Sequence, residues 1–189
     1  MTKSESAIIR GSVSATAQAA GHGIAQSLLA VDAIVVLDSS GSMGSSMGDG
    51  RTKFSVACDE LARLQARMPG RVAIVSFGST AQFAPGGVPP FVGGGTDMAA
   101  ALRLAGTMDA EDMRFIVVSD GIPDSEAAAL EAAACLRGQI DTIFIGGEDN
   151  TAGRRFLERL AHASRGQSVA DVVGHLSVHT IKMLGGGQQ

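Results

Sequence analysis

The sequence predicts an α/β fold in which a mostly parallel sheet carries helices on both faces. Short apolar runs alternate along the chain with longer stretches whose apolar residues recur at three- and four-residue spacing. The runs at residues 33–37 and 115–118 are apolar throughout, which is typical of strands buried on both faces of a sheet. Strands that alternate with helices in this way pair in parallel through crossover connections. Together, these two observations predict a doubly wound sheet.

The composition is that of a single globular domain. Of the 189 residues, 45% are hydrophobic and 18% are charged, which is enough apolar material for a sizeable core. The net charge of −4, without any basic run, argues against a nucleic-acid partner. Residues 31–184 carry the alternating pattern and form the expected domain, and residues 185–189 form a Gly-rich tail.

Residues 1–30 precede the regular pattern and are expected to form an N-terminal arm or an element added to the domain. Residues 7–10 have the composition of a short edge strand. Residues 14–30 are Ala-rich and are interrupted by Gly21 and Gly23. An extra strand, an extra helix and an arm that becomes ordered on a partner are all compatible with this stretch.

The chain is expected to work in the cytoplasm. No apolar run reaches the roughly 18 to 20 residues of a membrane-spanning helix, so no membrane partner is expected. Residues 1–30 lack the compact apolar segment of a signal peptide. Cys58 and Cys135 are expected to be reduced thiols in the core, both within helices.

The first half of the domain is expected to form three strands and a helix. A strand at residues 33–37 is followed by an amphipathic helix over residues 54–68, which Pro69 ends. Residues 72–77 form a second buried strand. A third strand at residues 80–84 follows a tight turn, so we expect it to pair antiparallel with the second.

The second half of the domain continues the alternation. Thr96 or Asp97 is expected to cap the helix that begins it, and Asp124 or Ser125 to cap a later one. The other expected elements are a strand at residues 115–118, an Ala-rich helix to Leu136, a strand at 140–145, a helix over 151–163, a short strand at 166–168 and a last helix from Asp171 to about Leu184.

Oxygen-bearing side chains follow the first strand at the point where it ends. Asp38, Ser40 and Ser42 occupy alternate positions there, with Gly41 between the two serines. A strand that opens into such a loop places its side chains at the carboxyl edge of the sheet, where binding sites of α/β proteins concentrate. One carboxylate and two hydroxyls form an oxygen-only half-shell that suits Mg²⁺, Mn²⁺ or Ca²⁺ and does not suit zinc.

Two later loops supply candidates for the other half of the shell. Thr96 follows three glycines, and Asp120 follows the strand at residues 115–118. Glycine has no Cβ, so its backbone can approach an ion site closely. Five such side chains around one octahedral cation leave a position for water or for an acidic group of a partner. The predicted metal ligands are Asp38, Ser40, Ser42, Thr96 and Asp120.

Three motifs mark these loops: Asp38-Ser-Ser-Gly-Ser-Met-Gly, Gly94-Gly-Thr-Asp-Met-Ala-Ala-Ala-Leu and Val118-Ser-Asp-Gly. In order and spacing they resemble the three loops of the metal-ion-dependent adhesion site in the von Willebrand factor A domain family. The resemblance covers about residues 31–183. It implies a doubly wound, six-stranded, mostly parallel sheet with one antiparallel edge strand.

The resemblance also implies a role for each candidate ligand. Ser40, Ser42 and Thr96 are implied to bind the ion through their hydroxyls, and Asp38 and Asp120 directly or through water. The bound Mg²⁺ or Mn²⁺, with Ca²⁺ as a further candidate, then grips an Asp or Glu of a partner protein. Intracellular members of the family work beside AAA+ ATPases or in multiprotein complexes. The expected function is therefore that of a bacterial, cytoplasmic, non-enzymatic adaptor.

Two other functions remain open at this stage. The ion can serve only as a brace in a structural subunit of an assembly. Alternatively, an aspartate that ends the first strand beside Mg²⁺ is the arrangement of a phosphatase-like enzyme. Such an enzyme needs a second carboxylate where Ser40 stands, and a lysine to hold the phosphoryl group. Lys3, Lys53 and Lys182 are all expected to be poorly placed for that task.

Overall fold

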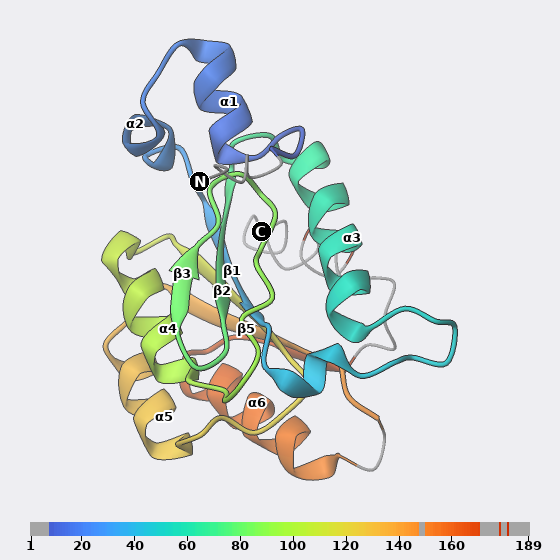
Figure 1. The fold of residues 1–189 in the computed structure, drawn as a ribbon. Coiled ribbons are helices and arrows are strands. Elements are labelled where there is room, and N and C mark those ends of the chain that lie inside the picture. Colours follow the sequence, from blue (N-terminus) through green and yellow to red (C-terminus); the bar gives the residue numbers. More distant parts are fainter. Residues whose placement is uncertain (1–7, 148–149, 171–177, 179–180, 182–189) are drawn as a thin grey trace.

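The structure is a computed structural model, and it describes residues 8–147, 150–170, 178 and 181. These residues form a six-stranded sheet in the order β3-β2-β1-β4-β5-β6 (Figure 1). Every neighbouring pair is parallel except β2 and β3. The predicted fold class, including the antiparallel edge strand, is confirmed. The strands are β1 (Ala33–Asp38), β2 (Val72–Phe77), β3 (Ala81–Phe83), β4 (Arg114–Ser119), β5 (Gln139–Phe144) and β6 (Ser168–Ala170).

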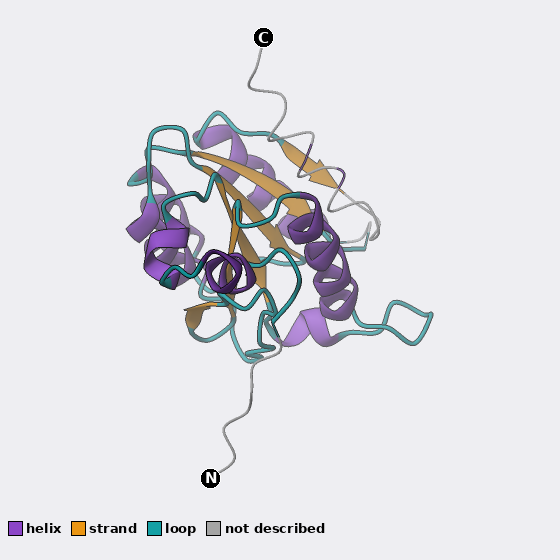
Figure 2. Ribbon diagram, turned by 90° about the horizontal axis from the view of Figure 1, so that it is seen from above, coloured by secondary structure: helices purple, strands orange, loops and turns teal. Residues whose placement is uncertain are grey.

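The strands lie between helices on both sides (Figure 2). Alternate side chains of the central strand enter two separate clusters of the core, so both faces of the sheet are apolar. Ile34 and Val36 belong to one cluster, with residues of α4, α5 and α6. Val35 and Leu37 belong to the other, with residues of α3. These helices are α3 (Lys53–Arg67), α4 (Met98–Ala105), α5 (Glu126–Ala134) and α6 (Thr151–Ala163).

Two short helices, α1 (Val13–Ala20) and α2 (Ile24–Leu28), form the segment before the sheet. Gly21 ends α1 in the left-handed conformation, so the glycine pair does mark the break between two helices. Residues 8–10 form loop and turn, and the edge strand predicted at 7–10 is not present in its described part. Both helices lie at the opposite end of the sheet from the loop that follows β1 (Figure 1).

The N-terminal segment docks on the end of α3. Gly11 is in the left-handed conformation, with φ of 83°, and its carbonyl accepts a hydrogen bond of 2.9 Å from the Gly70 amide. A Cβ at Gly11 would lie 2.1 Å from the carbonyl oxygen of Gln65, so only glycine fits there. The buried side chain of Gln65 in turn donates to the carbonyl of Gly87 at 3.1 Å. The segment is therefore packed against the domain rather than extended from it.

The structure differs from the predicted elements at the end of α5 and at the start of β6. The helix α5 stops at Ala134, before the predicted Leu136, because the Asp109 carboxylate accepts hydrogen bonds from the Arg137 and Gly138 amides and turns the chain toward β5. Cys135 therefore caps the helix and is exposed, so its expected place in the core is wrong. The strand β6 begins at Ser168, later than predicted. Before it, Gly166 passes so close to β5 that a Cβ there would lie 1.8 Å from the Ile140 carbonyl oxygen.

Most of the last helix predicted, from Asp171 to about Leu184, lies outside the described residues. Val178 and Ile181 are described, and both are helical. Ile181 packs on the same cluster as α3. Lys3, Lys182 and residues 185–189 also lie outside the described part of the chain. Within that part, no helix is both long enough and apolar enough to cross a membrane.

Gly11→Ala is expected to lower the free energy of unfolding by about 3 kcal/mol or more, because it adds a steric clash with Gln65 to the strain of a left-handed residue. Gly21→Ala is the matched control. Gly21 is also left-handed, with φ of 67°, but a Cβ there meets nothing within 4 Å. Gly21→Ala should lower the free energy of unfolding by only about 1–2 kcal/mol. Equal losses in chemical denaturation would show that the N-terminal segment does not pack tightly on α3.

Candidate metal site

The two aspartates of the candidate site come from neighbouring strands that end at the same level. Leu37 pairs with Val118 across the parallel β1–β4 contact, so Asp38 and Asp120 emerge together at the carboxyl edge of the sheet. The hydroxyl of Ser119 donates to Oδ2 of Asp38 at 2.5 Å and ties the two strand ends to each other. Both aspartates are almost fully buried.

The loop after β1 carries the two predicted serine ligands into the same place. The amide of Ser40 donates to Oδ1 of Asp38 at 2.8 Å, which turns the chain sharply at the end of the strand. A short 3₁₀ helix, η1 (Gly41–Gly44), then begins. The Ser40 and Ser42 hydroxyl oxygens lie 3.2 Å apart, and the Ser42 hydroxyl donates to Oδ1 of Asp120 at 2.7 Å. Four of the five predicted ligands are thus in one hydrogen-bonded cluster.

The oxygen atoms of this cluster fit a small, hard cation. Neighbouring ligands of an octahedral Mg²⁺, bound at about 2.1 Å, lie about 3 Å apart. The Ser40–Ser42 and Ser42–Asp120 oxygen pairs, at 3.2 and 2.7 Å, are close to that spacing. The described residues contain no group of three or more His, Cys, Asp or Glu placed to hold a metal. A cation bound here would therefore need hydroxyl ligands besides the two carboxylates.

Thr96 reaches this region through the backbone of its loop. The amide of Gly41 donates to the Gly94 carbonyl at 3.2 Å, which fastens the glycine loop to the loop after β1. Asp124 clamps Thr96 from the other side: its Oδ1 accepts from the Thr96 amide at 2.9 Å, and its own amide donates to the Thr96 carbonyl at 3.0 Å. The structure thus brings the loop of Thr96 beside the cluster.

Close contacts require two of the three glycines before Thr96, although the contacts are with neighbouring loops and not with the ion expected from the sequence. Gly94 is in the left-handed conformation, with φ of 71°, and a Cβ on it would lie 2.2 Å from the Ser79 hydroxyl oxygen. A Cβ on Gly95 would lie 2.7 Å from the Asp124 carboxylate. The groups that approach the two glycines thus belong to the neighbouring loops of Ser79 and Asp124. The glycines let three loops close on one another beneath the candidate site.

Near the site, the structure decides between the predicted residues for two helix caps, and it adds one buried serine. Asp97 caps α4 by accepting from the Ala100 amide at 3.0 Å, so Asp97 and not Thr96 is the cap. Ser125 and not Asp124 caps α5. The buried Ser39, which sequence reasoning missed, accepts a hydrogen bond from the Val92 amide and donates to the carbonyl of Phe77 at 2.8 Å. Its position between two predicted ligands is the one signal for it in the sequence.

Lys53 reaches the site, a contact that sequence reasoning did not foresee. Its Nζ lies 2.6 Å from Oδ2 of Asp120. Residues 45–52 form a narrow loop whose two ends meet beside the site. Ser46 pairs with Thr52, and the Lys53 amide donates to the Ser45 carbonyl at 3.2 Å. The contact between Lys53 and Asp120 could not be predicted from the sequence, because nothing in the composition of this loop shows that its ends meet.

Burial controls the ionisation of Asp38. Loss of water around its carboxyl raises the pKa above the ordinary value of 3.8, and hydrogen bonds from Ser119 and Ser40 offset the increase only in part. The neighbouring Asp120 raises the pKa further. The charged form of Asp38 is therefore costly in the metal-free chain.

No family model matches the sequence, and no curated protein matches it either. Solved structures do match its fold. An aerotolerance-related membrane protein from Bacteroides fragilis, carrying multiple mutations to serines, is 16% identical with a TM-score of 0.61, and the match covers 82% of this chain and 99% of that chain. A von Willebrand factor type A structure from Catenulispora acidiphila is 18% identical with a TM-score of 0.61, over 80% of this chain and 41% of that one.

A third match is the manganese-loaded TRAP protein of Plasmodium vivax, which is 21% identical with a TM-score of 0.51, over 70% of this chain and 62% of that chain. Identities this low show a shared fold. Together with the strand order, these matches show that the chain has the von Willebrand factor A fold.

Asp38→Asn is expected to stabilise the metal-free chain at neutral pH. Because the pKa of Asp38 is raised in the folded state, the folded chain binds this proton more tightly than the unfolded chain. Asp38 therefore reduces stability above its folded-state pKa, and the reduction disappears as the pH falls toward and below 3.8. Urea denaturation in EDTA should give the variant a higher free energy of unfolding than wild type at pH 7. The difference should shrink as the pH is lowered.

Asp49→Asn is the control for this experiment. Hydrogen bonds from the Arg51 backbone and side chain lower the pKa of Asp49, and its carboxylate is exposed. Replacing Asp49 should therefore not raise the free energy of unfolding at pH 7. If Asp38→Asn leaves stability at pH 7 unchanged or lower, burial does not destabilise the Asp38 carboxylate.

Proposed function

We propose that this chain is a metal-dependent protein-binding module, whose bound divalent cation grips an acidic side chain of a partner. The observation that carries the proposal is the oxygen cluster at the carboxyl edge of β1 and β4, in which Ser40, Ser42 and Asp120 are linked at 3.2 and 2.7 Å with Asp38 beside them. The proposed ion is Mg²⁺ or Mn²⁺, with Ca²⁺ as a further candidate. The manganese in the TRAP structure supports this choice.

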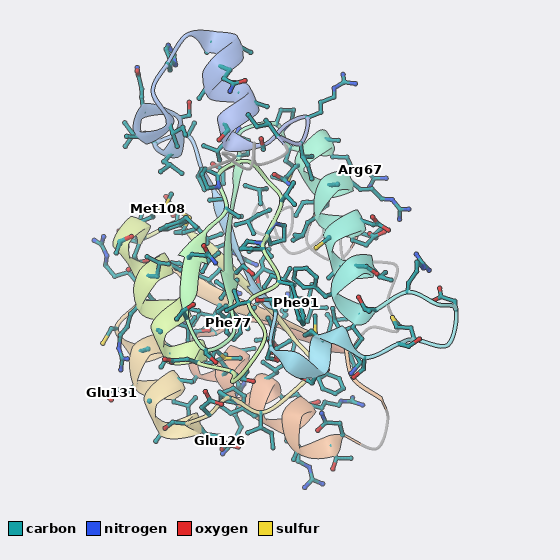
Figure 3. The ribbon with its side chains drawn as sticks, in the orientation of Figure 1. Arg67, Phe77, Phe91, Met108, Glu126 and Glu131 are labelled. Atoms are coloured by element: carbon teal, nitrogen blue, oxygen red, sulfur yellow. The ribbon has the colours of Figure 1, made fainter. Side chains whose placement is uncertain are left out.

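The residues around the cluster favour a protein partner. Gly41, Ser42 and Gly94 are exposed, so the cluster opens to the surface on that side. Phe91, labelled in Figure 3, is 50% exposed and lies against Gly44 of η1. Its ring packs edge-on against Phe54 at 5.1 Å between centroids. A rigid exposed aromatic ring beside a polar centre is typical of protein-binding surfaces.

The chemistry of the site favours an acidic group on the partner. Bound there, a divalent cation supplies a Lewis acid with at least one open position. The chain itself provides only two carboxylates, and its other candidate ligands are neutral hydroxyls, so the open position on the ion is available to a further anion. Ser42 and the loop of Thr96 border the open side, and they are the residues that we expect to present the ion to the partner.

We propose no catalytic activity for this site. The contact of Lys53 with Asp120 does bring a cation into it, as a phosphatase-like enzyme requires. Lys53 is nevertheless bound to Asp120, and Ser40 stands where such an enzyme needs its second carboxylate. Incubation with phosphate esters and Mg²⁺ should give no turnover. Turnover that Asp38→Asn abolishes would replace the binding proposal with the enzymatic one.

The setting of the module is also part of the proposal. We place it in a bacterial cytoplasm, acting as an adaptor for an AAA+ ATPase or another complex subunit, with no nucleic-acid or membrane partner. One structure of similar fold is described as a membrane protein, so this setting rests on the sequence alone. A brace within an assembly remains the alternative, in which the ion is needed for shape and not for contact.

The first test of the proposal is metal binding by the purified chain. Mg²⁺ or Mn²⁺ should bind one site and stabilise the fold by about 2.7 kcal/mol at a hundredfold excess over the dissociation constant. Asp120→Ala should weaken binding without unfolding the chain, and calorimetry should detect no binding to the double variant Asp38→Ala, Asp120→Ala. Unchanged affinity in the double variant would exclude this site as the metal site.

The second test separates contact through the ion from a brace. Thr96→Ala should weaken partner binding by about tenfold or more, about 1.4 kcal/mol, while keeping the fold. Thr96→Ser, which keeps a hydroxyl, is the matched control and should bind like wild type. Pull-downs from the native host with Mg²⁺, with EDTA and with an Asp38→Ala bait identify the partner, whose affinity is then measured with purified protein. Equal affinity for wild type and Thr96→Ala would favour the brace.

A further inference from the structure

The side chain of Lys53 occupies one oxygen of a predicted metal ligand. Its Nζ lies 2.6 Å from Oδ2 of Asp120, and the Asp120 side chain is only 1% exposed, against 22% for Lys53. A contact this short, from a half-buried ammonium to a buried carboxylate, is a charge-assisted hydrogen bond and not a solvated surface pair.

Two other polar atoms of Asp120 are occupied as well. Oδ1 accepts from the Ser42 hydroxyl at 2.7 Å. The main-chain carbonyl accepts from the side-chain amide of Asn150 at 2.7 Å. Asp120 is thus held in one orientation, and an ion that binds directly through Oδ2 has to compete with the ammonium of Lys53 for that oxygen.

The place of Lys53 in its helix is a second observation. It is the first residue of α3, where the positive end of the helix dipole disfavours a cation. Arg51 lies two residues earlier, but it turns outward to Asp49 and is 54% exposed. The inward direction of Lys53 is therefore not a general property of the cations in this segment.

We propose that Lys53 is a positioning residue that keeps Asp120 from binding the ion directly through Oδ2, and so preserves the ion's attraction for the carboxylate of a partner. The inference rests on the proposed function and deepens it. Held by Lys53, Asp120 faces the ion through Ser42 or through water, so fewer anions contact the ion. The chain gives up affinity for the metal and keeps affinity for the partner.

The charges of the cluster lead to the same conclusion. Asp38 and Asp120 supply two negative charges when ionised, and Lys53 supplies one positive charge. A divalent cation therefore leaves the loaded cluster with one positive charge, which matches one carboxylate of a partner. Without Lys53 the loaded cluster is neutral, and its attraction for a carboxylate is weaker.

Paired titrations of the full chain test this role. Mn²⁺ is titrated into wild type, Lys53→Gln, Lys53→Met and the control Arg51→Gln by calorimetry. Acetate is then titrated into each Mn²⁺-loaded protein, and the relaxation of water protons reports the water that acetate displaces. The Met variant keeps the apolar stem of Lys53, and Arg51→Gln removes the same charge from the same segment without touching Asp120.

The two Lys53 variants should bind Mn²⁺ about five- to tenfold more tightly than wild type and acetate several-fold more weakly, since one close charge is removed. Arg51→Gln should stay within about twofold of wild type in both titrations, as expected for an exposed, screened charge. A purely structural role for Lys53 would weaken both interactions together, so the opposite signs of the two changes identify the positioning role.

The outcomes separate this inference from the proposed function. If wild type binds Mn²⁺ but the Lys53 variants bind it no more tightly than Arg51→Gln does, the positioning role is wrong and the metal site stands. If wild type binds no Mn²⁺ and the Lys53 variants do, the binding function is overturned while Lys53 is shown to block the ion. If none of the proteins binds Mn²⁺, both are wrong.

Discussion

Parallel pairing of β1 with β4 is the contact on which the rest of the candidate site depends. The register sets Leu37 opposite Val118, and both strands end one residue later, so Asp38 and Asp120 emerge side by side. Every residue of β1 is buried, with alternate side chains in separate core clusters. A slip of one residue would exchange the two sets of side chains and separate the carboxylates. The packing of the core thereby sets the distance between the two acidic groups.

Buried hydroxyls hold the loops above this contact. Ser39 joins the end of β1 to the end of β2 and to the loop at Val92, and Ser119 joins the end of β4 to Asp38. Both serines are fully buried with their hydrogen bonds made. Satisfied polar groups in a low-dielectric region rigidify their surroundings. In the metal-free chain, hydrogen bonds of the protein itself therefore hold the candidate ligands in position.

Strand patterns and loop motifs were sufficient to predict the sheet, because strands as apolar as β1 and β4 require cover on both faces. They also predicted four side chains that the structure brings into one cluster. They were not sufficient for Lys53, whose contact depends on how residues 45–52 fold back, or for the clamp of Asp124 on Thr96. These contacts join loops far apart in the chain, and local periodicity carries no signal for them. The small side chains of α1 likewise show no clear period, so its packing could not be predicted.

The pair of Lys53 with Asp120 has a consequence for the life of the protein before it meets a cation. The buried carboxylate already has an internal counter-charge, and the Asp38 carboxyl can retain a proton more readily than an ordinary aspartate. Folding of the chain therefore does not have to wait for metal. The newly made protein can accumulate in a metal-free form, and under the proposed function the supply of the cation becomes a separate step that sets when the molecule is ready to bind.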